Sequence, residues 1–301
     1  MPRSFCQITD LTADEVHQVF DLCRRMKSGK VSPRPLEGKA AACVFTKASL
    51  RTRVSFEVGI FELGGQAVYI TDNEIKLGQR ESVADVARVL SRYVGLIMIR
   101  TFKQSDVEGL AEHGSVPVVN GLTDLVHPCQ IMGDYFTALE HLEKKEKFAI
   151  AYLGDGNNVC NSWLNLASLL PIDLRVGTSP DTPPDEGCLT RAKSNSDSSI
   201  LITGDPKEAV SGADVIYTDV WASMGEKHLA DAKEEKLRRF QVNSALLEGA
   251  APKAIVMHCL PAERGREITD EVMDGPQSVV FDEAENRLHI QKAIMAFLLE
   301  S

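Results

Sequence analysis

Apolar runs of strand length alternate with stretches of helical periodicity along the chain, and this alternation restricts the fold more than any other feature. Strands that alternate with helices usually pair in parallel, because each helix carries the chain back across the sheet. The expected strands are 41–45, 67–70, 96–99, 116–119, 148–153, 174–176, 199–202, 215–218 and 254–257. We therefore expect an α/β fold with two domains, each a mainly parallel sheet flanked by helices.

The length of 301 residues is sufficient for two domains of about 150 residues each. A charged stretch, residues 140–147, interrupts the apolar pattern, so we place the domains at 1–140 and 141–282. Residues 283–299 have the pattern of one amphipathic helix. Residues 178–199 are rich in Pro, Ser, Asp and Gly and predict a surface excursion of little catalytic interest, with a short helix near 188–194.

The formal net charge of −10 argues against nucleic acid or an anionic membrane surface as the main partner, because the overall field would repel both. An anionic substrate then needs a local basic cluster. The chain shows no signal peptide and no membrane-spanning run, which predicts a cytoplasmic protein. Seven scattered cysteines suit reduced thiols better than a disulfide framework.

The strand ending at Phe45 leads into a helix whose buried face is marked by Phe56, Ile60 and Leu63. Ser49–Thr52 would then lie at the N-terminus of that helix, where unpaired N–H groups and the helix dipole favour an anion. Hydroxyl groups and Arg51 add donors suited to phosphate. An ordinary serine N-cap followed by surface arginines explains the local pattern equally well.

Two further candidates follow expected strands. Arg100 comes directly after residues 96–99, and His127 and Gln130 follow the strand and turn that end near Asp124. The crevice beyond the carboxyl ends of parallel strands is the usual ligand site of such sheets. Arg100 and a neutral His127 can donate to a carbonyl oxygen that gains negative charge, and Gln130 can bind an amide-like group. Taken singly, a histidine at a strand end is more often structural.

In the second half, Gly154–Asn158 follows a strand and opens a helix, as a dinucleotide-binding turn does. The third glycine of that fingerprint is missing, so nicotinamide binding is only weakly indicated, and Asn158 can instead face a substrate. Asp219–Gly225 combines a carboxylate with Ser223, Met224 and a glycine, a mixture typical of a substrate-contacting loop. Asp219 could bind a cationic amine, or be a solvated residue in a turn.

His258 and Cys259 end another buried strand. Together with His127 and Cys129 they offer zinc-ligand types in two short clusters. Neither cluster has the usual ligand spacing, and we expect no metal.

Four separated motifs, in this order, resemble those of the aspartate and ornithine carbamoyltransferase family, and the resemblance covers nearly the whole chain. Ser49–Arg53 is similar to the family's phosphate motif, and His127–Gln130 to its carbamoyl motif. Asp219–Gly225 and His258–Pro261 resemble the amine loop and the cysteine motif of the ornithine enzymes, which favours ornithine over aspartate.

The resemblance implies a first domain that binds carbamoyl phosphate, a second that binds the amino acid, and a final helix, about 283–301, that returns to the first domain. It also implies a homotrimer with active sites near subunit interfaces and no cofactor. Carried over by position, the carbamoyl phosphate residues are Ser49, Leu50, Arg51, Thr52, Lys76, Arg100, His127, Gln130, Cys259, Leu260 and Arg287. The ornithine residues are Asn158, Asp219, Ser223 and Met224, and the catalytic set is Arg100, His127, Asp219 and Cys259.

The chain departs from the family pattern at three positions. Leu50 replaces a threonine, which is mild if the backbone N–H is the phosphate contact. Lys76 stands where Gln or His is usual, and in the aspartate enzymes a lysine from a similar loop reaches a neighbouring subunit's site. Glu263 replaces an expected histidine, with no clear consequence. Transfer to another amine such as putrescine or N-acetylornithine, a nucleotide-dependent oxidoreductase, and a binding-only relative are the alternatives.

Overall fold

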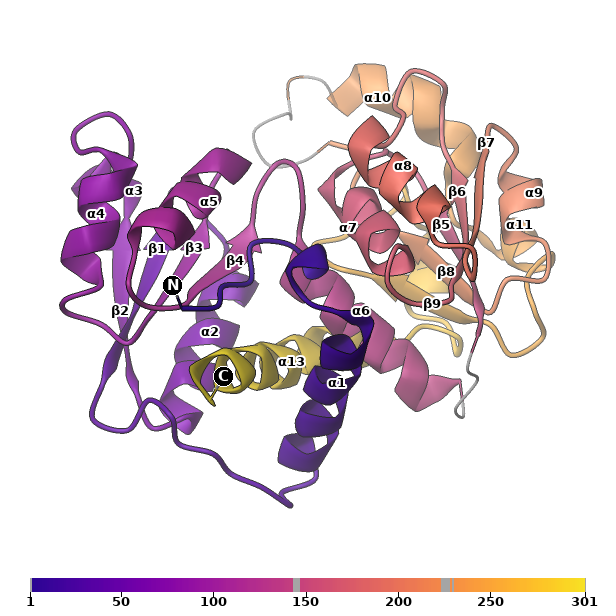
Figure 1. The fold of residues 1–301 in the computed structure, drawn as a ribbon. Helices are drawn as coiled ribbons and strands as arrows, with labels where there is room; N and C mark the ends of the chain where they lie inside the picture. The colour runs from indigo at the N-terminus through magenta and orange to yellow at the C-terminus, as the bar shows by residue number, and fades with distance from the viewer. Residues whose placement is uncertain (1, 143–146, 223–227, 229, 301) are drawn as a thin grey trace. The chain divides into compact units, whose positions relative to one another are not determined.

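The computed structural model describes residues 2–142, 147–222, 228 and 230–300. The chain forms two compact units: unit 1 is Met1–Gly133 with Arg287–Ser301, and unit 2 is Asp134–Asn286 (Figure 1). The chain enters unit 2 within helix α6 (Pro128–His141) and leaves it within helix α13 (Val280–Glu300). The observed division therefore falls inside two helices, whereas a charged stretch marked the expected boundary.

Unit 1 is built on a parallel sheet with the strand order β2-β1-β3-β4. The strands are β1 (Ala40–Phe45), β2 (Gln66–Thr71), β3 (Leu96–Arg100) and β4 (Val118–Leu122). β4 begins later than expected: Pro117 precedes it, and proline has no N–H to give to a ladder. The parallel sheet expected for the first domain is confirmed.

Helices cover both faces of this sheet. Side chains of α3, α4 and α5 pack with Ala42, Val44, Ile97 and Ile99 in one apolar cluster. The helices of unit 1 are η1 (Ile8–Asp10), α1 (Ala13–Lys27), α2 (Leu50–Glu62), α3 (Asp72–Ile75), α4 (Val83–Leu90) and α5 (Gln104–His113).

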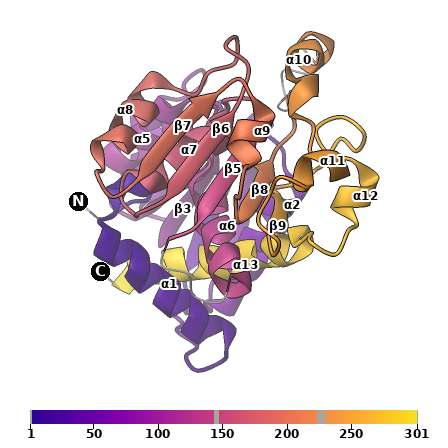
Figure 2. The same cartoon turned by 90° about the vertical axis from the view of Figure 1, so that its right-hand side faces the viewer.

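Unit 2 is built on a parallel sheet with the order β7-β6-β5-β8-β9, and Figure 2 shows these strands in that sequence. The strands are β5 (Ala149–Leu153), β6 (Asp173–Gly177), β7 (Ser199–Thr203), β8 (Val215–Thr218) and β9 (Ile255–His258). The helices are α7 (Asn158–Ala167), α8 (Glu186–Ser194), α9 (Pro206–Val210), α10 (Ala230–Leu237), η3 (Arg238–Phe240), α11 (Ser244–Leu247) and α12 (Asp270–Met273). All five expected strands of the second half are present.

The two faces of the unit 2 sheet carry different cores, because successive residues of a strand point to opposite sides. Ala151 and Ile216 pack with Phe240 and Val272 on one face. On the other face Trp163 of α7 meets the ring of Tyr217 edge-on at 5.6 Å, and Tyr152 stacks on Tyr217 at 5.8 Å. This stacked pair lies directly beneath the carboxyl ends of β5 and β8.

The C-terminal part of α13 packs against α2 within unit 1. A Cβ at Gly59 of α2 would lie 3.1 Å from Lys292 and 3.3 Å from Met295, so a glycine permits the close approach of the two helices. Lys292 also forms an ion pair with Glu62 at the end of α2. The expected return of the last helix to the first domain is confirmed by these contacts and by the membership of Arg287–Ser301 in unit 1.

The segment expected to be a plain surface excursion lies against the turn after β5. The N–H of Gly156 donates to the carbonyl of Thr182 at 3.0 Å. A Cβ at Gly156 would lie 2.3–2.5 Å from backbone atoms of Thr182, Pro183 and Pro184. The excursion therefore supports the turn that presents Asn158, a relation that no sequence pattern indicated.

Among the described residues, no helix combines the length and apolarity that crossing a bilayer requires.

Replacing Gly156 with alanine should destabilise the protein by about 1 to 3 kcal/mol, because the new methyl group overlaps backbone that cannot rotate away. Urea denaturation measures the change. Gly187→Ala, at an exposed position in α8 where the new methyl group meets only the side chains of Asp185 and Arg191, is the control and should cost much less. Equal stability of the Gly156→Ala variant and the wild type would contradict the close contact.

Candidate functional site

The candidate residues follow the strands at which the winding of each sheet reverses. In unit 1 the order β2-β1-β3-β4 makes β1 and β3 neighbours, with connections leaving in opposite directions. In unit 2 the same reversal occurs between the paired strands β5 and β8. Ligands of open α/β sheets bind at such switch points, beyond the carboxyl ends of the strands. Each unit therefore has one predicted ligand position, set by strand order.

In unit 1 the loop after β1 leads into the N-terminus of α2. Ser49 is the N-cap, and its side chain accepts a hydrogen bond from the Thr52 N–H at 3.3 Å. The N–H groups of Leu50 and Arg51 precede that bond in the first turn, where helix geometry provides no intrahelical acceptor. The Nε of Arg51 is buried without a hydrogen-bond partner among the described residues. Both local interpretations hold: Ser49 caps the helix, and donors remain for an anion.

Two buried guanidinium groups meet at the hydroxyl of Thr52. Arg100 donates from Nη1 to Thr52 Oγ1 at 3.2 Å, and Arg287 donates from Nη2 to the same oxygen at 2.8 Å. Thr52 is fully buried, and Arg100 and Arg287 are 5% and 3% exposed. Residues 235 positions apart thus meet at the start of α2, and their charges favour an anion there.

His127 lies at the start of α6 and is 5% exposed. Burial holds its pKa well below the usual value, and the positive charges of Arg287, Arg100 and Lys47 lower that pKa further. Protonation of the ring would add a fourth buried cation to this group. His127 is therefore a neutral imidazole, which can donate to a carbonyl oxygen without the cost of a buried charge.

The other predicted residues of unit 1 have different placements. Gln130 is buried in the first turn of α6, and the Leu50 side chain is 75% exposed, so the replaced threonine position points to solvent. Lys76 is exposed at the end of α3 with a left-handed backbone, φ 41°. Within the described part of the chain, Lys76 forms no hydrogen bond or ion pair with the group around Thr52.

Sequence reasoning passed over Lys47, which lies two residues after the end of β1. Its side chain is 7% exposed, its Nζ lies 2.9 Å from Asp124 Oδ1, and it stands 5.2 Å from the ring centroid of Phe102. It contributes to the lowered pKa of His127. The only sequence feature that could have indicated a role for Lys47 was its position between the strand and the Ser49 motif.

In unit 2 the turn after β5 and the end of β8 are joined through Asn157. Its Oδ1 caps α7 by accepting from the N–H groups of Val159 and Cys160 at 2.9 and 3.3 Å. Its Nδ2 donates to Asp219 Oδ2 at 2.9 Å. Asn158, the predicted substrate residue, is buried as the first residue of α7. Asn157 is thus an anchor for Asp219, which sequence reasoning did not distinguish from its neighbour.

Cys259 donates its thiol hydrogen to the other oxygen of Asp219 at 3.0 Å. Burial raises the pKa of the Cys259 thiol well above its usual value, and the neighbouring Asp219 carboxylate raises it further. The group is therefore a thiol donor and a poor nucleophile. Cys259 and Leu260 belong to unit 2, together with Asp219, while the other predicted carbamoyl phosphate residues belong to unit 1.

The backbone around Leu260 is fixed by the side chain of His258. The N–H of Leu260 donates to His258 Nδ1 at 2.9 Å, and His258 Nε2 lies 3.1 Å from Glu267 Oε1. His258 and Glu267 are fully buried. Leu260 has a left-handed backbone, φ 57°, and is followed by a cis peptide bond to Pro261. Glu267 therefore sets the tautomer of His258 and, through it, the course of the loop after β9.

Comparisons with known proteins agree with this geometry. A family model described as the carbamoyl-P binding domain of aspartate/ornithine carbamoyltransferase matches residues 3–140, and one for the Asp/Orn binding domain matches residues 146–298. The chain belongs to the aspartate/ornithine carbamoyltransferase family. Ornithine carbamoyltransferase of Syntrophus aciditrophicus is 48% identical over 302 residues, covering 99% of this chain and 100% of that protein. The relative from Methanothermobacter thermautotrophicus is 51% identical over 289 residues, covering 95% and 96%.

A solved structure, ornithine carbamoyltransferase from Pyrococcus furiosus, matches with a TM-score of 0.94 at 44% identity, covering 100% of this chain and 98% of that one. The resemblance to the family read from the motifs is confirmed. Ser223 and Met224 of the amine loop lie outside the described residues.

Asp219, His258 and Cys259 offer ligand atoms within 4.8 Å of one another, as a metal site would. Both ring nitrogens of His258 are already engaged, one by the Leu260 N–H and the other by Glu267. The thiol hydrogen of Cys259 is likewise used on Asp219. The three side chains therefore bind one another and the loop, and holding a metal would require this arrangement to break.

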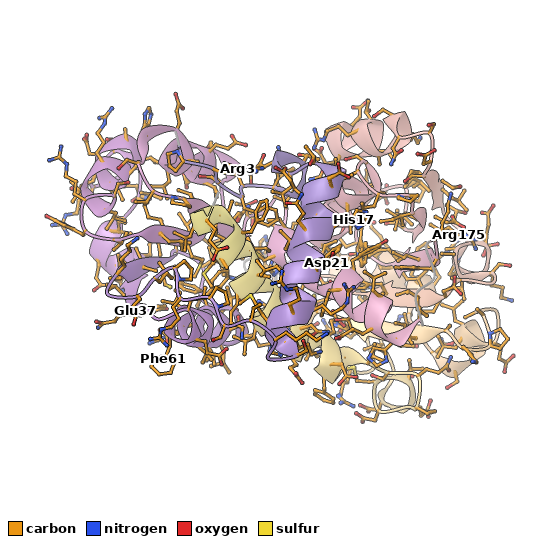
Figure 3. The ribbon with its side chains drawn as sticks, turned by 60° about the horizontal axis from the view of Figure 1, so that its bottom comes forward. Arg3, His17, Asp21, Glu37, Phe61 and Arg175 are labelled. Atoms are coloured by element: carbon orange, nitrogen blue, oxygen red, sulfur yellow. The ribbon has the colours of Figure 1, made fainter. Side chains whose placement is uncertain are left out.

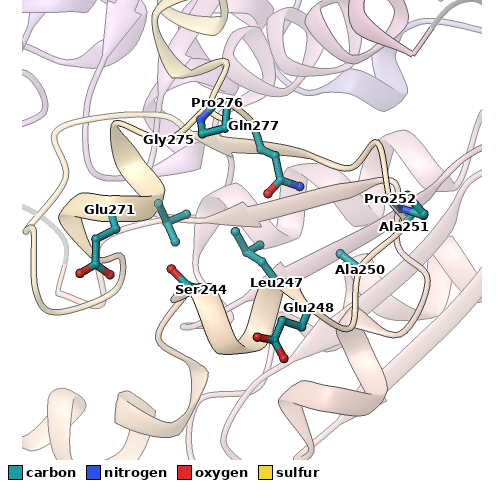
Figure 4. A pocket seen from close by; sticks show the side chains of 11 residues that line it. Ser244, Leu247, Glu248, Ala250, Ala251, Pro252, Glu271, Gly275, Pro276 and Gln277 are labelled. Carbon is teal, nitrogen blue, oxygen red and sulfur yellow. The ribbon is translucent and has the colours of Figure 1, made fainter.

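A cavity of about 460 Å³ lies near the amino end of β9, whereas Cys259 follows its carboxyl end. Figure 4 shows the side chains that line the cavity. Segments just before β9 and just after α12 line it, together with α11; Leu247 and Val272 supply apolar surface, and Glu248 and Glu271 supply carboxylates. None of the predicted site residues lines it. It lies at the amino end of the strand, away from the switch point of the sheet.

Acid should weaken folding through His127. The unfolded chain binds the proton near pH 6.5, and the folded protein, with its depressed pKa, does not. The free energy of unfolding should therefore fall as pH drops below about 6.5, and less steeply in a His127→Gln variant. Urea denaturation between pH 5 and 7.5 measures both slopes. His17→Gln, on the exposed side of α1 (Figure 3), is the control, and identical slopes for His127→Gln and the wild type would contradict a neutral His127.

Proposed function

We propose that the chain is an ornithine carbamoyltransferase, which transfers the carbamoyl group of carbamoyl phosphate to the δ-amine of L-ornithine and releases L-citrulline and phosphate. The observation that carries this proposal is the meeting of Arg100 and Arg287 at Thr52 beside a neutral His127. Such a group suits a dianionic phosphate joined to a carbonyl. Membership in the family and the names of the relatives support ornithine as the acceptor.

Carbamoyl phosphate would bind in unit 1. The N-terminus of α2, with Ser49, Leu50, Arg51 and Thr52, would take the phosphate through backbone N–H groups, hydroxyls and charge. The exposed Leu50 side chain supports a contact through its N–H. Arg100 and His127 would donate to the carbonyl oxygen, and Gln130 would bind the carbamoyl amine.

Ornithine would bind in unit 2, where Asn158, Asp219, Ser223 and Met224 would hold it. The uncharged δ-amine attacks the carbonyl carbon, a new C–N bond forms, and negative charge develops on the carbonyl oxygen. Donors aimed at that oxygen act mainly on the transition state. The tetrahedral intermediate then expels phosphate as the C–O bond breaks. No metal or organic cofactor takes part.

Asp219 and Cys259 would position the amine, and the Asp219 carboxylate would accept the proton that the amine loses. The thiol stays protonated in the free protein because of burial and the neighbouring carboxylate, so Cys259 would act as a hydrogen-bond donor. Leu260 would contribute its backbone, whose course is fixed by His258. Covalent catalysis by Cys259 is not needed, since the amine is itself the nucleophile.

The proposed assembly is a homotrimer with active sites near subunit interfaces. A stripe of apolar side chains along one side of α2 supports an interface between copies: Leu50, Val54, Val58 and Phe61 are all exposed, Phe61 at 76% (Figure 3). Burial of such a stripe against a second copy removes apolar surface from water. Lys76, exposed in unit 1, would then serve the site of a neighbouring subunit. The cytoplasmic location stays a prediction.

Purified protein should form citrulline from carbamoyl phosphate with ornithine, and much less product with putrescine or N-acetylornithine. Arg100→Ala should lower kcat about 100- to 1,000-fold because a buried oxyanion donor is lost. Ser49→Ala should cost less, since the backbone N–H groups of the helix remain. Arg51→Ala is the control for phosphate binding and should abolish turnover at ordinary substrate concentrations.

The outcomes separate the alternatives. A preference for another amine would agree with the proposed fold and reaction but would contradict ornithine as the acceptor. An absorbance change with NADH would favour an oxidoreductase, and no turnover with any amine would favour a binding-only relative.

Phe61→Glu should break the assembly, because a charge would be buried at the interface between copies. Light scattering after size-exclusion chromatography should show a trimer for the wild type and smaller species for the variant. Phe281→Glu, at a phenylalanine of unit 2 that is 68% exposed, is the control and should remain trimeric. A wild-type monomer would contradict the proposed assembly.

A further inference from the structure

Two fully buried carboxyl groups meet inside unit 2. Asp134, on α6, and Glu283, on α13, have no solvent-exposed surface, and their side chains hydrogen-bond each other. The hydroxyl of Tyr217, also fully buried, donates to Asp134 Oδ2 at 2.7 Å and lies 3.4 Å from Glu283 Oε1. No part of the mechanism above uses this pair.

Two carboxylates cannot hydrogen-bond each other without a proton, because each can only accept. Burial raises the pKa of Glu283 well above its usual value, and the charge of Asp134 raises it further. Tyr217 also keeps its proton, since burial and the charge of Asp134 raise its pKa. The group therefore holds one negative charge, one carboxylic acid and one phenol.

The surrounding bonds indicate which group carries the proton. Asp134 accepts from Tyr217, and an ionised carboxylate is the stronger acceptor. Glu283 Oε2 accepts from the backbone N–H of His258 at 2.8 Å, which leaves its other oxygen to donate to Asp134. The arrangement assigns the charge to Asp134 and the proton to Glu283.

The pair touches both strands that carry the proposed amine site. Tyr217 of β8 lies two residues before Asp219, which follows that strand, and His258, the last residue of β9, directly precedes Cys259. Groups near the pair include Tyr217 of β8 and Asp219 just after it, His258 of β9 and Cys259 just after it, and Tyr152 of β5, which stacks on Tyr217. A change at the pair therefore reaches the strand ends where Cys259 and Asp219 meet.

We propose that Asp134 and Glu283 are positioning residues, which share one proton and hold the ends of β8 and β9 so that Asp219 and Cys259 face the amine. The proposal rests on the proposed function for its kinetic test and on spectroscopy for its direct test. Its physical content is that one member of the pair must donate and the other accept.

Amide substitutions test whether one member of the pair must donate and the other accept. In Glu283→Gln the amide nitrogen donates to Asp134 while the oxygen accepts from His258, which reproduces the carboxylic acid. In Asp134→Asn the amide can donate to an ionised Glu283 and still accept from Tyr217. In the double variant the amide oxygens are held by the Tyr217 hydroxyl and the His258 N–H, so two amide nitrogens face each other, and an amide nitrogen cannot accept. Asp282→Asn, at the exposed residue next to Glu283 on α13, is the matched control.

Each single variant should keep kcat/KM for ornithine within about fivefold of the wild type, and the double variant should lose about 100-fold or more, a non-additive result. The loss should appear in kcat and in KM for ornithine, and KM for carbamoyl phosphate should change much less, because only Cys259 and Leu260 of its predicted contacts lie in unit 2. Asp282→Asn should match the wild type. Thermal unfolding of each variant detects a general loss of folding.

Infrared spectroscopy at neutral pH provides the direct test, independent of turnover. The wild type should show the C=O stretch of a protonated, buried carboxylic acid, and Glu283→Gln should lack it. Absence of that band in the wild type, or a double variant that is more stable and as active as the wild type, would overturn the proposal, because amides would then relieve repulsion between two carboxylates. If the wild type makes no citrulline, the proposed function fails while the infrared band still decides the shared proton.

Discussion

The hydroxyl of Thr52 is the point on which unit 1 depends, because two guanidinium groups from distant parts of the chain donate to it. Arg100 comes from the end of β3 and Arg287 from α13, so a single oxygen joins a strand, the start of α2 and the returning helix. Like charges brought together out of water are costly, and an anion bound beside them offsets that cost. The same concentration of charge keeps His127 neutral and thereby makes it a suitable donor to a carbonyl oxygen.

In unit 2 the buried ionisable groups are mainly acidic, whereas those around Thr52 in unit 1 are basic. Carboxyl groups, phenols and a thiol collect beneath the ends of β8 and β9, and burial raises the pKa of Tyr217, Cys259 and Glu283. These groups stay protonated and donate to carboxylates: Tyr217 and Glu283 to Asp134, and Cys259 to Asp219. A cationic amine is attracted to such a site, and its proton has acceptors nearby. Each proposed substrate thus carries a charge opposite to that of the side chains that would bind it.

Supporting contacts in both units come from residues with no motif of their own. Lys47 extends along Phe102 to Asp124, Asn157 joins the turn after β5 to Asp219, and Glu267 orients His258. Each acts on a neighbour that the motifs do contain. Such residues hold site groups within the small tolerance that catalysis allows, and their loss is felt through the groups they orient.

The sequence by itself determined the alternation of strands and helices, the α/β class and the helix N-terminus at Ser49, because these depend on local periodicity and capping. The separated motifs also gave the family and most of the candidate residues. Only the tertiary structure decided the strand orders, which put β1 beside β3 and β5 beside β8, and therefore which strand ends share a crevice. The resemblance had placed Arg287 and Thr52 in one site, and the structure added the hydrogen bond between them; the structure alone brought Glu283 to Asp134 and laid the excursion over Gly156. The reason is physical: these contacts join residues far apart in the chain, and periodicity within a segment carries no information about which distant segment it meets.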